Sequence, residues 1–216
     1  MVTDTDKRIE KFGALTFILA GVLFFIANLI TISLPNPPSA ETDFIKWLSE
    51  NRIYLSIQNE ILFFATISLI PSSFVLYKLL KKTTSRSSLL GLGLMLMAIP
   101  VLAMLDIVAG RLVYPVYDIN LSFDILKLVL SIYHGGMHAV SIIFGMSIFL
   151  ISFATRDTIF PKYHWYVGLI TGVMQIIGSY PWLTGFFFNL IVIFFFSFWL
   201  VLNGINILFE VNKSDR

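Results

Sequence analysis

Six long apolar stretches, separated by short polar segments, constrain this sequence more than any other feature. An α-helix rises about 1.5 Å per residue, so about 20 apolar residues are needed to cross the ~30 Å hydrocarbon core of a bilayer. Only 13% of the residues are charged, whereas soluble domains carry about 25%. The sequence therefore predicts an all-α integral membrane bundle with transmembrane helices over 13–34, 55–80, 89–110, 125–155, 163–180 and 183–209.

The polar segment between the first two predicted spans carries a further helix signal. It begins with a Pro-Asn-Pro-Pro run at residues 35–38, which ends the first span because proline cannot continue a helix. Apolar side chains then follow at helical spacing over residues 44–48. We predict one six-helix domain over residues 1–216, with a short helix near residues 40–51 that lies in the outer membrane interface.

The distribution of lysine and arginine predicts the orientation of the chain. Eleven of them, at positions 7, 8, 11, 78, 81, 82, 86, 156, 162, 213 and 216, fall on one side of the predicted spans. Four, at positions 46, 52, 111 and 127, fall on the other side. Because cytoplasmic loops carry the excess of positive charge, we predict a plasma-membrane protein with both termini in the cytoplasm.

Composition excludes several kinds of site and partner. The chain has no cysteine, so disulfides, thiolate metal ligands and cysteine nucleophiles are excluded. No basic patch with interleaved aromatic residues occurs, so we expect no nucleic-acid partner. We also expect no nucleotide. Haem is disfavoured because two histidines one turn apart on one helix cannot bind opposite faces of a porphyrin. The expected partners are membrane lipids and a small amphiphilic ligand, with the oligomeric state left open.

Polar side chains inside the predicted spans gather toward one side of the membrane. An ionisable group at mid-span costs about 2.5–3.5 kcal/mol, so such a group is usually paired or used. Four are present: Glu60, Asp106, His134 and His138. The same outer half of the bilayer holds four candidate substrate-binding groups: Asn28, Arg111, Gln175 and Asn189. This one-sidedness predicts a polar pocket that opens toward the outer leaflet.

The spacing of the two histidines indicates metal-binding chemistry. Side chains four residues apart share a helix face, so His134 and His138 can chelate a divalent metal while Asp106 and Glu60 complete a tetrahedron. Zinc fits this nitrogen and oxygen ligand set best, with manganese or iron as alternatives. A zinc ion with an open position lowers the pKa of its bound water to about 7. One hypothesis is therefore a metal-dependent hydrolase acting on a lipid or small amphiphile, with Glu60 and Asp106 as the catalytic carboxylates.

Other interpretations fit the same residues. The histidines can be neutral packing groups, Glu60 can reach water at the interface, and Asp106 can pair with Arg111 or Lys127. The amides can form hydrogen bonds between helices. A second hypothesis is a binding or transport protein for a cation or small solute, and a third is a non-enzymatic membrane component. Because the polar groups occupy only one half of the bilayer, a continuous conduction path is disfavoured.

Two resemblances accompany this pattern. The segment 13–28, the run Trp47-Leu-Ser-Glu-Asn-Arg52 and the run Leu76-Tyr-Lys-Leu-Leu80 resemble a family of uncharacterised bacterial membrane proteins, domain of unknown function 4386, which implies a polytopic membrane fold and no particular activity. His134-x-x-x-His138 with Asp106 is more faintly similar to the zinc-dependent intramembrane hydrolases that include alkaline ceramidases and adiponectin-receptor-like proteins. That resemblance implies a hydrolytic zinc site, although those proteins have seven spans and a third histidine, whereas His164 lies at the opposite interface here.

Overall fold

The computed structural model describes residues 4–81, 86–114, 116–117, 119, 121–156, 158 and 160–213. In these ranges the chain forms six α-helices and no strand. Five of the helices are long and apolar enough to cross a membrane, so the chain is a multi-pass membrane protein. The helices are α1 (Asp4–Ser33), α2 (Glu41–Leu80), α3 (Arg86–Gly110), α4 (Phe123–Thr155), α5 (Lys162–Gly178) and α6 (Pro181–Lys213).

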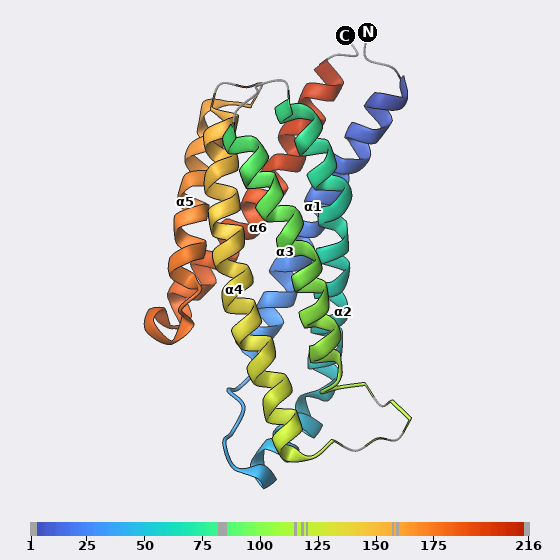
Figure 1. Cartoon of the computed structure of the whole chain (residues 1–216), viewed down its shortest axis with the longest axis vertical. Coiled ribbons are helices and arrows are strands. Elements are labelled where there is room, and N and C mark those ends of the chain that lie inside the picture. Colours follow the sequence, from blue (N-terminus) through green and yellow to red (C-terminus); the bar gives the residue numbers. More distant parts are fainter. Residues whose placement is uncertain are drawn as a thin grey trace.

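The helices pack as a ring in chain order, and α6 closes the ring against α1 (Figure 1). Both termini lie at one end of the bundle, which we call the terminal end; the opposite end is the distal end. Phe17, Leu69, Met95, Ile148 and Trp199 are fully buried in the core. Large apolar side chains also cover the outward faces, as expected for helices that contact lipid.

The fifth helix is the exception among the six predicted spans. With 17 residues, α5 is about 25 Å long, less than the ~30 Å hydrocarbon core. In Figure 1 the turn between α5 and α6 ends partway along the bundle, well short of the distal end. Gly185, with φ 73° and ψ 174°, interrupts the first turns of α6, a conformation that glycine adopts readily because it lacks a Cβ. The distal part of the bundle is therefore built without α5.

The short interfacial helix predicted near residues 40–51 is not a separate element. These residues form the first turns of α2, which has 40 residues and is therefore about 60 Å long. Phe44 and Trp47 are buried together with Leu126 at the start of α4. The apolar face predicted over residues 44–48 thus packs in part against the bundle, because burying aromatic side chains there removes a large apolar area from water.

Close backbone contact holds α4 and α5 together. A Cβ added at Gly172 would lie 2.9 Å from the carbonyl oxygen of Gly145 and 2.9 Å from the backbone nitrogen of Phe149. Helices in lipid associate mainly through such tight packing, since lipid chains are as apolar as the helix surfaces. Gly172 is therefore a structural requirement of this interface.

We predict that Gly172→Ala destabilises the protein by about 1–3 kcal/mol, because the added methyl group pushes α5 away from α4. Gly93→Ala is the matched control, since a Cβ at Gly93 meets nothing within 4 Å. This control is expected to be neutral or to stabilise by about 0.5–1 kcal/mol. Titration with a denaturing detergent measures the free energy of unfolding of both variants. Equal effects of the two substitutions would contradict the packing argument.

Candidate functional site

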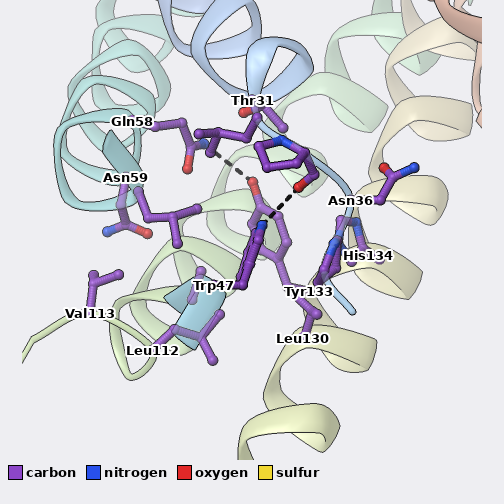
Figure 2. A pocket seen from close by; sticks show the side chains of 15 residues that line it. Thr31, Asn36, Trp47, Gln58, Asn59, Leu112, Val113, Leu130, Tyr133 and His134 are labelled. Carbon is purple, nitrogen blue, oxygen red and sulfur yellow. Dashed lines mark hydrogen bonds between the residues drawn. The ribbon is translucent and has the colours of Figure 1, made fainter. Parts of the chain in front are cut away.

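A cavity of about 130 Å³ lies at the distal end, among α1, α2, α3, α4 and the two segments that connect α1 to α2 and α3 to α4 (Figure 2). Neither α5 nor α6 contributes a residue to its lining. Most of the lining side chains are apolar, such as Leu55, Leu112 and Leu130. The cavity is therefore an apolar chamber in the part of the bundle that the short α5 does not reach.

Three buried polar side chains line this chamber: Gln58 and Asn59 on α2, and Tyr133 on α4. The Nε2 of Gln58 donates a hydrogen bond of 3.4 Å to the Tyr133 hydroxyl. Trp47 forms part of the wall, and its Nε1 donates to the carbonyl oxygen of Pro35 at 2.9 Å. Both bonds are visible in Figure 2. The polar groups are few and held in place, as in ligand pockets generally.

A wider hollow of about 260 Å³ adjoins the chamber. The two share Pro37, Leu130 and His134 as lining residues. The hollow also includes Phe44 and Lys127, and Lys127 Nζ lies 5.0 Å from the ring centroid of Phe123. His134 is exposed and borders both spaces, so it marks the boundary between them.

Asp106 is buried, with only 1% of its surface exposed. It lies on α3 one turn before the lining residue Ala109, on the side away from the distal end. Its Oδ2 accepts a hydrogen bond of 3.5 Å from the Thr66 hydroxyl. Its Oδ1 has no hydrogen-bond partner among the residues that the structure describes. Asp106 is therefore a poorly satisfied acid close to the base of the chamber.

His138 lies away from the chamber. Its Nδ1 lies 2.6 Å from the carbonyl oxygen of Ser179, and since a carbonyl can only accept, this nitrogen carries the proton. Its ring also contacts Tyr180 and Trp182, with centroids 4.8 and 5.6 Å apart. His138 thus fastens the turn between α5 and α6 to α4.

Glu60 faces outward from α2, and the Tyr114 hydroxyl donates to its Oε1 at 2.8 Å. The four predicted metal ligands are consequently separated: Glu60 contacts Tyr114, Asp106 contacts Thr66, His138 contacts Ser179 and His134 borders the chamber. Across the described ranges, no group of three or more histidine, aspartate or glutamate side chains is placed to hold a metal ion. Glu60, Asp106, His134 and His138 therefore do not form one cluster among the described residues, since equal depth along helices does not require a shared face.

The predicted substrate-binding residues lie outside both the chamber and the hollow. Asn28 donates to the carbonyl of Phe24 on its own helix at 2.8 Å, and Asn189 accepts from Thr184 at 3.1 Å. Gln175 holds a buried Oε1 without a hydrogen-bond partner. Arg111 lies half-buried in the turn after α3 and forms no ion pair with Asp106 within the described part of the chain. These four residues thus do not line the two spaces described here.

Sequence reasoning missed a second polar cluster, near the terminal end. His164 is fully buried, with Nε2 3.2 Å from Asn203 Oδ1 and Nδ1 3.4 Å from the Thr155 hydroxyl. Its ring stacks on Phe160 at 4.6 Å. This cluster joins α4, α5 and α6, and both of its imidazole nitrogens have partners. Its signal in the sequence was a histidine and an asparagine at similar depth in the last two apolar stretches.

Comparison with protein-family models, curated proteins and solved structures yields no match for this chain. Its function is therefore argued from the geometry of the site.

We predict that His138→Ala lowers the free energy of unfolding by about 1–2 kcal/mol, because the substitution leaves the Ser179 carbonyl without its donor. His134→Ala is the matched control and is expected to cost less than about 0.5 kcal/mol, since His134 is exposed. Denaturing-detergent titrations of both variants measure the difference. A larger loss for His134→Ala would contradict the assignment of His138 as the structural histidine.

The contact between Tyr114 and Glu60 predicts a loss of stability at high pH. Burial, reinforced by the hydrogen bond to Glu60, raises the pKa of Tyr114 above its ordinary value of 10.0. A raised folded-state pKa contributes stability below the unfolded pKa, and this contribution is lost as pH rises through the folded pKa. Wild type should be more stable than Tyr114→Phe at about pH 8, and the difference should shrink above about pH 10. Unfolding titrations across this range test the prediction, which a constant difference would contradict.

Proposed function

We propose that this multi-pass membrane protein binds a small amphiphilic molecule in the distal chamber, and that the distal end faces the outer side of the plasma membrane. The lysine and arginine distribution supports this orientation, because the segments at the distal end carry the smaller share of the positive charge. The chamber then opens at the level of the outer leaflet, where amphiphiles concentrate.

One observation carries the proposal: buried polar groups line a chamber whose lining is mostly apolar. Gln58, Asn59 and Tyr133 are buried there, and each retains hydrogen-bonding capacity that a ligand can use. Small-molecule sites typically combine apolar walls with a few fixed polar groups. The geometry thus suits a molecule with a polar head and an apolar tail.

The dimensions support a small ligand. Sites for drug-sized molecules usually enclose about 300–1,000 Å³, whereas the chamber encloses about 130 Å³. The adjoining hollow of about 260 Å³ offers space for the part of an amphiphile that does not fit inside. We therefore favour a polar group in the chamber and an apolar chain that leaves past Leu130 and His134.

Binding is favoured over metal-dependent hydrolysis by the positions of the side chains. Hydrolysis by a zinc site requires three protein ligands around one ion, and among the described residues no three histidine, aspartate or glutamate side chains are placed to share one. The carboxylate of Glu60 faces outward toward Tyr114. A binding function requires no such convergence.

The probe for this proposal is n-butanol, added to the protein in lipid nanodiscs. Saturation-transfer NMR with irradiation of aromatic protons detects binding to protein and not to phosphatidylcholine, which has no aromatic protons, and nanodiscs without this chain correct for the aromatic groups of the scaffold. We predict that Ala109→Phe abolishes binding by filling the chamber, and that Asn59→Leu weakens it about tenfold through the loss of one polar partner. Ala139→Phe on the exposed face of α4 is the control and should bind as wild type does. Absence of butanol binding to wild type, or unchanged binding to Ala109→Phe, would overturn the proposal.

A further inference from the structure

We propose that the chamber selects amphiphiles with a positively charged ammonium headgroup, which Asp106 binds. This inference rests on the proposed function and names the chemical class of its ligand. It arises from Asp106 itself, a buried group that its described neighbours satisfy only in part, through one long hydrogen bond from Thr66.

The surroundings of Asp106 lack the donors that a buried carboxylate needs. Its Oδ1 has no hydrogen-bond partner, and the single bond to Oδ2, from Thr66, is 3.5 Å long. A hydrogen bond of this length is weak. Buried charges are normally paired, and buried polar groups are normally hydrogen-bonded. An ammonium group meets both requirements, because it carries a positive charge and several N–H donors.

The position of Asp106 connects this requirement to the chamber. It lies on α3 one turn from Ala109, which lines the chamber, and its carboxylate is buried within the bundle. The bond between Gln58 and Tyr133 is long, at 3.4 Å. An ammonium group can enter past Gln58 and Tyr133, whose weak bond it can replace, and move one turn deeper along α3 toward the free oxygen of Asp106.

Few charged side chains lie close to the base of the chamber. No described residue of the lining is a lysine or arginine, although Arg52 Nε donates to the carbonyl oxygen of the lining residue Val113 at 2.8 Å. Lys127 lies in the outer hollow, where it is exposed and therefore screened by solvent and salt. Glu60 faces away and contacts Tyr114. Asp106 is the buried carboxylate one turn from the lining residue Ala109.

Three ligands with the same four-carbon tail test the inference: n-butylammonium, n-butanol and butyrate, at constant ionic strength and neutral pH. The protein is the full chain in nanodiscs of zwitterionic lipid, and binding is measured by the same aromatic saturation transfer. We expect wild type to bind butylammonium about tenfold more tightly than butanol, and butyrate more weakly than either. Asp106→Asn keeps the shape of the side chain and removes its charge, so the preference for butylammonium should disappear while butanol binds within about twofold of wild type.

Glu60→Gln is the matched control, because it removes an outward-facing carboxylate from the same end of the bundle; it should leave the preference intact. Tyr133→Phe is a second variant, should Asp106→Asn fail to fold, and is expected to weaken butylammonium more than butanol. Equal affinities of wild type for butylammonium and butanol, or a preference that survives in Asp106→Asn, would overturn the inference while the proposed function stands. If wild type bound methylammonium as tightly as butylammonium, the requirement for an apolar tail would be overturned. Failure of all these ligands to bind wild type would overturn the proposed function as well.

Discussion

The length of α5 is the constraint on which the rest of the distal architecture depends. A helix of 17 residues does not reach across a hydrocarbon core of about 30 Å, so the turn that follows it stops partway along the bundle. His138 holds this turn against α4 through Ser179, and Gly185 allows the backbone to reverse into α6. The distal part is consequently enclosed by four helices and their connections, and the chamber forms there.

Buried polar groups in this bundle differ in how well they are satisfied. His164, near the terminal end, has partners at both ring nitrogens, Thr155 and Asn203, although Asn206 Nδ2 on the same helix as Asn203 is unpartnered among the described residues. Near the chamber, Asp106 has a single long hydrogen bond and one oxygen that is unpartnered among the described residues. A buried polar group without its partners is costly, so Asp106 is the group beside the chamber that gains most from a ligand.

Helix positions could be predicted from the sequence because hydrocarbon thickness determines the length of apolar runs; the span expected over 89–110 corresponds to α3 at Arg86–Gly110. The rotation of each helix about its axis could not be predicted in the same way. When a helix is apolar on all sides, the sequence carries little information about which face meets its neighbours. Asp106 and His138 therefore share a depth but face different partners, Thr66 and Ser179. The continuity of α2 through residues 51–55 was predictable in principle, because no proline or glycine interrupts it there.

The hydrogen bond between Trp47 and the Pro35 carbonyl has a consequence for spectroscopy. Among the four tryptophans of the chain, Trp47 is the one whose indole lines the chamber. Its fluorescence depends on the polarity next to the ring, so the protein carries an intrinsic optical sensor in the wall of its own cavity. With the other three replaced by phenylalanine, the emission of this single indole would report hydration of the chamber without any added label.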